Sequence, residues 1–241
     1  MSELVNTHNT NHHHIPDLSY EDRYRAIISE LPYSAPSDTH DVTSLHRINN
    51  AIHEAHINHP EYTDKLSHLK VMDSNYDTVF LKDTANNTCY LSSRGTDLTP
   101  GQHTLVRDLY NDAQIAVGNS PHRFGTTEQQ LVHQILDHPE CAKWEAVGHS
   151  AGGRVVEDIG VKYHDIKVTS FETGRTILDK DNLKNLFSGN KHDNITSHRV
   201  ISDPIAGGIS PGHTINHYVD HDHFLDNFNP LKNHTILNYT Y

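Results

Sequence analysis

One serine of this chain lies where a catalytic nucleophile would be expected. The stretch "WEAVGHSAGGRVVEDIG", residues 144–160, reads as a strand, a turn and a helix, with Ser150 at the turn. A serine held at such a junction has a strained backbone that exposes its hydroxyl, and side chains two residues away on either side would collide. Gly148 and Gly152 remove that obstacle. The N–H of Ala151 then lies in the first helical turn, where unpaired donors and the helix dipole favour an oxyanion.

A serine hydroxyl needs a base at neutral pH, and the base needs an orienting carboxylate. In enzymes with this strand–turn–helix nucleophile, the acid and the histidine follow the serine along the chain. Asp203 fits the acid because it comes directly after the strand-like "HRVIS" and before Pro204. An ordinary loop aspartate is the competing interpretation. The spacing around Ser150 also fits a glycine-rich helix start that only packs against a sheet.

Several histidines downstream of Asp203 could be the base. We favour His223 in "HDHFLDNF", then His221, then His213. His221 and His223 could instead chelate a metal with Asp222 or Asp220, but no further ligands follow at a recognised spacing. We therefore expect neither a metal nor an organic cofactor.

The elements that must hold these residues alternate after residue 100. Strand-like "WEAVG", "KVTSFETG" and "HRVISD" are interleaved with helical patterns near 104–117, 127–137, 151–164 and 179–187. This alternation predicts an α/β fold with a mostly parallel sheet and helices on both faces. Earlier, "LSHLKVM", "TVFLKD" and "TCYLSSRG" read as strands, and "TANN" joins the last two as a hairpin-type turn.

Extra helices are predicted ahead of the strands. One begins after Ser19 as a candidate cap and stops at Pro32, and a second covers 42–57. The length of 241 residues suits a single core, so we expect one domain over 17–241. Residues 1–16 are mostly Asn, Thr and His and read as a disordered arm.

Composition narrows the partners and the compartment. The formal net charge of −12 argues against nucleic acid or an anionic membrane surface as the main partner. No apolar run is long enough for a bilayer, and the first residues do not look like a secretory signal, so we expect a soluble, cytoplasmic-type protein. Cys89 and Cys141 are expected to be reduced, mostly buried thiols.

Histidine is unusually frequent in this chain. Protonation of all 23 histidines would reverse the sign of the net charge. An unperturbed imidazole titrates near pH ~6.5, so we hypothesise that mild acid reverses the surface field.

Several motifs together resemble the class 3, fungal-type lipases of the α/β-hydrolase fold. They lie in order over about residues 88–228: "YLSSRGTD", "VRDLYNDAQIA", "VGHSAGG", "KVTSFETG", "VISDPIAG" and "HFLDNF". The resemblance implies that Thr96 in the "RGT" turn supplies one oxyanion donor, with Arg94 and Gly95 shaping that turn. It implies that Ala151 supplies the other donor.

The same resemblance implies a triad of Ser150, Asp203 and a histidine, acting on acylglycerols, phospholipids or smaller esters. Residues 97–108, "DLTPGQHTLVRD", are polar where such lipases often have an apolar lid helix, so strong activation at an oil surface is not expected. We expect a lipid or small ester substrate, with no membrane insertion beyond transient contact with a lipid surface. The alternatives are a non-catalytic binding or structural protein with this fold and a His-rich metal-binding module.

Overall fold

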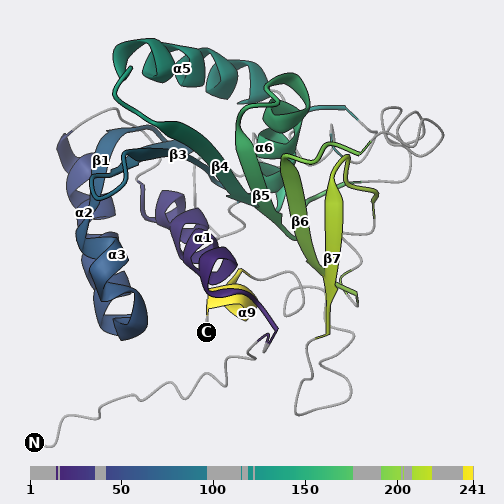
Figure 1. Ribbon diagram of the computed structural model, residues 1–241, viewed down its shortest axis with the longest axis horizontal. Helices are drawn as coiled ribbons and strands as arrows, with labels where there is room; N and C mark the ends of the chain where they lie inside the picture. The colour runs from purple at the N-terminus through teal and green to yellow at the C-terminus, as the bar shows by residue number, and fades with distance from the viewer. Residues whose placement is uncertain are drawn as a thin grey trace, which may run out of the picture.

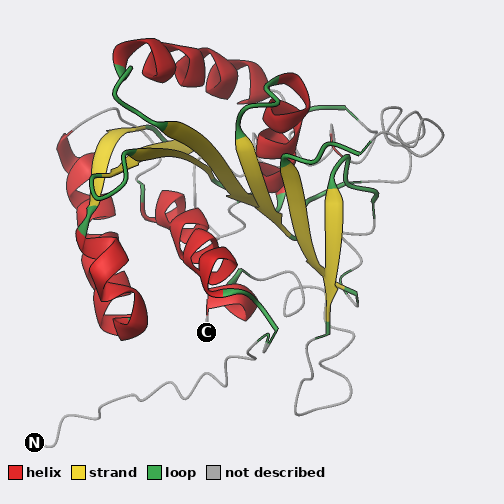
Figure 2. Cartoon of the chain, viewed as in Figure 1, coloured by secondary structure: helices red, strands yellow, loops and turns green. Residues whose placement is uncertain are grey.

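A sheet of seven strands forms the centre of the described fold, with the strands side by side in chain order (Figure 1; Figure 2). The computed structural model describes residues 15, 17–35, 42–96, 115, 119–121, 123–175, 191–201, 203, 208–218 and 236–240. The strands are β1 (Leu69–Ser74), β2 (Thr78–Asp83), β3 (Thr88–Ser93), β4 (Lys143–His149), β5 (Lys167–Phe171), β6 (Ile195–Val200) and β7 (His213–His217).

The direction of the strands changes once across the sheet. β1, β2 and β3 are antiparallel, whereas β3 to β7 are parallel. The hairpin between β2 and β3 forms at the predicted turn, where Asn87 has a positive φ of 54°. Asn tolerates this conformation better than most residues, and the Asn86 side chain accepts a hydrogen bond from the Thr88 N–H at 2.8 Å. The prediction of a mostly parallel sheet is confirmed.

Helices lie on both faces of the sheet, as predicted. α5 and α6 cover one face, whereas α1 and α9 lie against the other (Figure 1). The helices are α1 (Tyr20–Glu30), α2 (Val42–Asn58), α3 (Thr63–Ser67), α5 (Arg123–Asp137), α6 (Ala151–Lys162) and α9 (Leu237–Thr240), with 3₁₀ turns η1 (Leu31–Ser34) and η2 (Pro60–Tyr62). The helices predicted near 104–117 and 179–187 lie outside the described residues, apart from residue 115.

The start of α1 follows from its cap. The Ser19 hydroxyl accepts a hydrogen bond from the Asp22 N–H at 3.1 Å, as expected for an N-cap serine. At the other end, α1 ends at Glu30, and the chain continues through Pro32 as the 3₁₀ turn η1. Pro32 occupies the start of η1, where a missing N–H costs little because the first turn of a helix has no internal acceptor for it.

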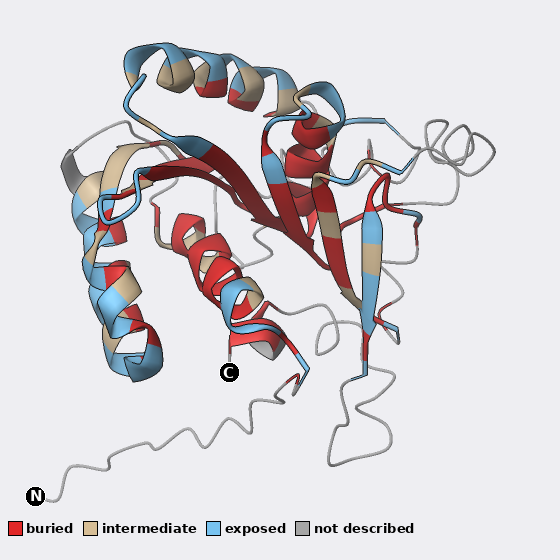
Figure 3. Ribbon diagram, in the orientation of Figure 1, coloured by how far each residue is buried: buried red, intermediate tan, exposed pale blue. Residues whose placement is uncertain are grey.

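Two apolar layers sandwich the sheet because successive strand residues point to opposite faces. On β2, Val79 and Leu81 face the layer formed with α1, α2 and α3, whereas Phe80 faces the layer under α5 and α6. Figure 3 shows that β3, β4 and β5 are buried along almost their whole length, whereas β7 is largely exposed. β4, which leads to Ser150, therefore lies in the most buried part of the sheet.

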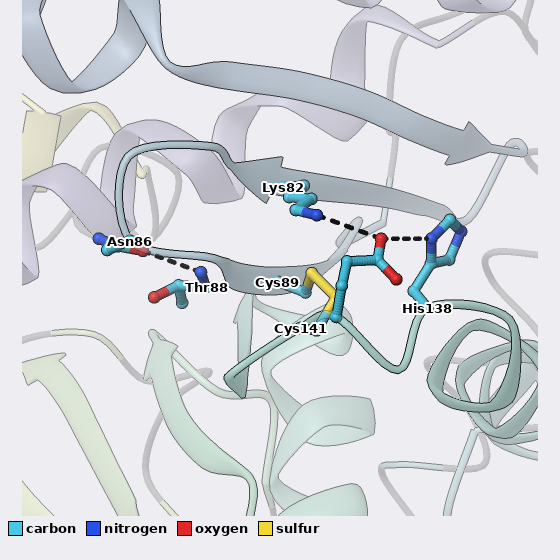
Figure 4. Close-up of a disulfide and its surroundings, with 7 residues drawn as sticks. Lys82, Asn86, Thr88, Cys89, His138 and Cys141 are labelled. Carbon is cyan, nitrogen blue, oxygen red and sulfur yellow. Dashed lines mark hydrogen bonds and ion pairs between the residues drawn. A yellow bond between two sulfur atoms is a disulfide. The ribbon is translucent and has the colours of Figure 1, made fainter.

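The two cysteines form a disulfide, which corrects the expectation of two reduced thiols. Cys89 on β3 and Cys141 just before β4 have their Cα atoms 5.7 Å apart (Figure 4). The parallel pairing of β3 with β4 brings the starts of both strands together, and Thr88 lies opposite Lys143. Disulfides persist mainly in oxidising compartments, so this bridge weighs against the cytoplasmic-type localisation, which stays a prediction.

Ile15 falls inside the predicted disordered arm, yet its side chain is only 1% exposed and packs with Leu18 and Tyr239. Arg23 of α1 holds it through a hydrogen bond from Nη2 to the Ile15 carbonyl at 2.9 Å. The packed part of the chain therefore includes Ile15, and the rest of the predicted arm lies outside the described residues. None of the helices within the described ranges is long and apolar enough to cross a membrane.

Candidate active site

Ser150 lies directly between β4 and α6, as the sequence predicted. Its backbone has φ 56° and ψ −125°, a region that L-residues rarely occupy. Neighbouring segments fix this conformation: the Ser150 N–H donates to the Phe171 carbonyl at 2.9 Å, and the Ser150 carbonyl accepts from the N–H groups of Arg154 and Gly174, both at 3.2 Å. Strained residues of this kind persist only where the surrounding structure determines them, and they gather at functional sites.

The two flanking glycines are required by close backbone contacts. A Cβ on Gly148 would lie 2.5 Å from the Gly152 carbonyl oxygen, and a Cβ on Gly152 would lie 2.1 Å from the Ser93 carbonyl oxygen. Because backbone atoms cannot move aside as a flexible side chain can, α6 can begin this close to β3 only with glycine at these positions. The sequence prediction for this turn agrees with the structure.

The "RGT" turn after β3 lies against the serine. A Cβ on Gly95 would be 3.0 Å from the Ser150 Cβ and 2.8 Å from the His149 carbonyl oxygen. Thr96 follows directly and is partly exposed, and Ala151 is buried in the first turn of α6. Both predicted oxyanion residues are thus next to residues that pack around Ser150, and their role as donors stays a prediction.

Tyr33 of η1 ties the N-terminal segment to this site, and sequence reasoning missed it. Its hydroxyl accepts a hydrogen bond from the Gly95 N–H at 3.0 Å and lies 2.8 Å from Nδ1 of His149. One oxygen therefore holds both the "RGT" turn and the residue before the nucleophile. No local pattern marks Tyr33, because its partners are 62 and 116 residues away along the chain.

Arg94 anchors the same turn from the other side. Its side chain is 1% exposed, and its guanidinium carbon lies 3.7 Å from the centroid of the Tyr76 ring. The Arg94 N–H donates to the Asp77 carbonyl at 2.9 Å. A guanidinium over a tyrosine face is an attractive cation–π contact, so Arg94 is held firmly at this position, and its role in shaping the turn stays a prediction.

A buried ion-pair network joins α6 to the segment after β5. Arg175 pairs with Glu157 of α6 through Nε and with Asp158 through Nη2 at 3.2 Å. Glu157 also accepts hydrogen bonds from the hydroxyls of Ser170 and Thr173, at 2.6 and 3.0 Å. These contacts fix the segment after β5, whose Gly174 N–H bonds the Ser150 carbonyl.

Asp203 is buried beyond the end of β6, as expected for the acid. It is 4% exposed, and its N–H donates to the Val200 carbonyl at 3.0 Å. β6 is separated from β4 by β5 alone, and all three strands are parallel, so Asp203 and Ser150 lie on the same carboxyl edge of the sheet.

A second buried carboxyl, Glu172, follows β5 between them, and sequence reasoning missed it. Its side chain has no exposure, and its backbone has a positive φ of 45°. Burial and the neighbouring Asp203 raise the pKa of Glu172 well above its usual range. A charged residue inside the strand "KVTSFETG" could have been noticed, although its partners lie on other elements.

The predicted base candidates fall in different places. His213 lies at the start of β7, opposite Thr196 at the amino end of β6, and its Nε2 is 3.1 Å from Oδ1 of Asp193. This is the sheet edge opposite to Ser150, so the position of His213 argues against it as the base. His221 and His223 lie outside the described residues, as does the polar stretch 97–108.

The fold is similar to those of solved fungal lipases. Lip2 lipase from Yarrowia lipolytica aligns with a TM-score of 0.55 at 14% identity, over 94% of this chain and 95% of that one. A mutant form of MDLA from Penicillium cyclopium aligns with a TM-score of 0.50 at 16% identity, over 93% and 100% of the two chains. The sequence matches no family model, and no curated protein sequence matches it. The similarity confirms the predicted α/β-hydrolase fold of the fungal-type lipases.

Proposed function

We propose that this protein is a serine ester hydrolase with Ser150 as its nucleophile. The observation that carries the proposal is the backbone of Ser150, at φ 56° between β4 and α6, with the "RGT" turn packed against its Cβ. A turn that serves packing alone has no need of a serine in a region that favours glycine. The lipase-like fold supports the same reaction class.

In the proposed reaction, Ser150 Oγ attacks the ester carbonyl as its proton passes to a histidine. His223 is the preferred candidate for this base, and His221 is the alternative. The Asp203 carboxylate orients the imidazole and stabilises its cation. The oxyanion receives hydrogen bonds from the N–H groups of Ala151 and Thr96, and the first of these belongs to a helix N-terminus. The alcohol leaves with the proton, and water then releases the acyl group by the same steps.

The substrates that we propose are esters of lipid type, such as acylglycerols and phospholipids, or smaller soluble esters. Contact with a lipid surface would be transient, and the chemistry described needs neither metal nor organic cofactor.

Labelling with a fluorophosphonate tests the proposal directly. We expect one adduct by intact mass on the wild-type protein and none on Ser150→Ala, because only an activated serine reacts with this probe. Ser210→Ala is the matched control, since this serine is also buried but is bonded to Glu157 at 3.3 Å within the ion-pair network. An unlabelled, folded wild-type protein would favour the alternative of a binding or structural protein that keeps this fold.

A further inference from the structure

Three neighbouring parallel strands each lead into one residue of the site. β4 leads into Ser150, β5 into Glu172 and β6, three residues later, into Asp203. Backbone hydrogen bonds join the three ends: the Ser150 N–H donates to Phe171, and the Glu172 N–H donates to the His198 carbonyl at 2.8 Å. Glu172 therefore lies between the nucleophile and the acid, yet the reaction proposed above does not use it.

The two oxygens of the Glu172 carboxyl have different surroundings. Oε1 accepts hydrogen bonds from the Val200 N–H at 2.7 Å and from the Tyr239 hydroxyl. Within the described part of the chain, no N–H or O–H group donates to Oε2. The Val200 backbone links Glu172 to Asp203, because its N–H donates to Glu172 Oε1 and its carbonyl accepts from the Asp203 N–H at 3.0 Å. The neighbouring Asp203 carboxyl adds to burial in raising the pKa of Glu172. A hydrogen bond between the two carboxyls needs a proton, because two ionised carboxylates can only accept.

The groups that contact the Glu172 carboxyl carry no positive charge in the part of the chain that the structure describes. They are Asp203, the Tyr239 hydroxyl and the Val200 N–H. Two adjacent buried carboxylates would repel each other and both would lose their hydration. One shared proton removes both costs and leaves a single negative charge.

We propose that Glu172 is a positioning residue, which keeps a proton on Oε2 and donates it in a hydrogen bond to the Asp203 carboxylate. The assignment rests on the proposed function, in which Asp203 must stay ionised to stabilise the imidazolium. Oε2 is the oxygen with room for the proton, because Oε1 already accepts two hydrogen bonds. The bond fixes one Asp203 oxygen and leaves the other to face the base.

The backbone of Glu172 supports a role for its side chain. A φ of 45° disfavours every residue except glycine and, to a lesser degree, Asn and Asp. A glutamate at this position costs stability relative to glycine, and its carboxyl makes contacts that glycine would lose. Tyr239 and Val200 hold that carboxyl in place from α9 and β6.

Two substitutions separate this role from simple packing. Glu172→Gly suits the backbone but removes the donor to Asp203, so we expect kcat for a soluble ester to fall by roughly 10²-fold with little change in KM. Glu172→Gln keeps an N–H donor that cannot ionise, and it should restore most of that loss. A Gln variant as inactive as the Gly variant would overturn the proposal, because it would show that Glu172 acts as an anion.

An infrared measurement decides the protonation state without relying on activity. At pH 8 the wild-type protein should show the carbonyl band of a neutral carboxylic acid, and Glu172→Gln should lack it. Glu30→Gln is the matched control, since Glu30 is a half-buried carboxyl whose pKa is raised to about 7, and its replacement should leave the band in place. An unchanged spectrum in Glu172→Gln overturns the proposal even if the Gly variant fails to fold. Failure of the proposed function appears separately, as absent labelling of Ser150.

Discussion

At the scale of single residues, the Tyr33 hydroxyl connects two turns of the site, those that contain Gly95 and Ser150. It accepts from the Gly95 N–H and lies within hydrogen-bond distance of His149, so it sets the separation between the "RGT" turn and the nucleophile turn. An oxyanion hole works only if its donors are placed before the charge develops. In the proposed reaction, Tyr33 would therefore affect the rate by positioning the "RGT" turn, without touching the reacting atoms.

Tyr33→Phe should lower kcat more than it raises KM. The substitution leaves the buried Gly95 N–H without its acceptor, which costs about 1–3 kcal/mol, and lets the turn move away from Ser150. We expect the rate of fluorophosphonate labelling to fall about tenfold, in line with a displacement of one donor. Tyr20→Phe is the control, because that hydroxyl bonds the Glu61 carbonyl at the surface, at 3.0 Å. Equal rates for Tyr33→Phe and wild type would contradict this role.

Which site residues can be read from the sequence depends on how local their contacts are. Ser150, Gly148 and Gly152 act on each other within one turn, so their spacing predicts them. Tyr33 and Glu172 were missed because their partners are far along the chain, 62 residues for Gly95 and 28 for Val200. Only the folded sheet brings such residues together.

At the scale of elements, the disulfide between β3 and the start of β4 fastens the two strands that approach the site. It closes a loop with a sequence separation of 52 residues, for which the chain-entropy model gives a stabilisation of about 4 kcal/mol. Figure 4 shows it beside Lys82 and His138, which both bond the Glu140 carboxylate, at 3.1 Å each.

Removing the disulfide should destabilise the protein without abolishing the reaction. Cys89→Ala with Cys141→Ala is expected to lower the free energy of unfolding by up to about 4 kcal/mol, measured by urea denaturation. Reductant should shift the wild-type transition toward that of the variant and leave the variant unchanged. Two titratable thiols in unreduced, denatured wild-type protein would show instead that the bridge is absent.

Helices and strands whose apolar residues recur at a regular spacing could be predicted from the sequence, and the other elements could not. α1, α2, the β2–β3 hairpin and the β4–α6–β5 unit follow from apolar spacing, caps and turn residues. β7 was missed because most of its side chains are exposed, so that "HTINH" lacks an apolar alternation. The disulfide was missed because only the parallel pairing of β3 with β4 brings Cys89 close to Cys141.

At the scale of the whole molecule, His198 and Glu30 give opposite dependences of the free energy of unfolding on pH. Burial lowers the pKa of His198 from 6.5 to about 4, although the facing Asp22 carboxylate raises it in part. The unfolded chain binds this proton first, so the free energy of unfolding falls as the pH drops from about 6.5 to about 4. The difference between the pKa of His198 in the unfolded and the folded state corresponds to about 3 kcal/mol in the free energy of unfolding.

Glu30 acts in the other direction. Burial raises its pKa to about 7 from 4.5, so its contribution to stability is complete below pH 4.5 and is lost as the pH rises to 7. The two effects oppose each other between pH 4.5 and 6.5. Over that range the contributions of Glu30 and His198 to the pH dependence should therefore largely cancel.

Urea denaturation of two variants at a series of pH values from 4 to 8 should separate the contributions of Glu30 and His198 to the free energy of unfolding. Glu30→Gln should be more stable than wild type at pH 8, and this advantage should disappear as the pH falls to about 4.5, because the Glu30 contribution that offsets His198 is absent. His198→Gln should reverse that trend. An acid loss that persists in His198→Gln would assign the dependence to other histidines.

The order of the strands has a consequence for biosynthesis. Each strand from β2 to β7 pairs with the one before it, so none is inserted between two earlier strands. A ribosome releases the chain from its N-terminus, and each new strand meets an edge that is already formed. The nascent protein therefore grows at one open edge, whose free backbone groups can pair with a neighbouring nascent chain. Until the next strand emerges, a chaperone bound at that edge would prevent this pairing between chains.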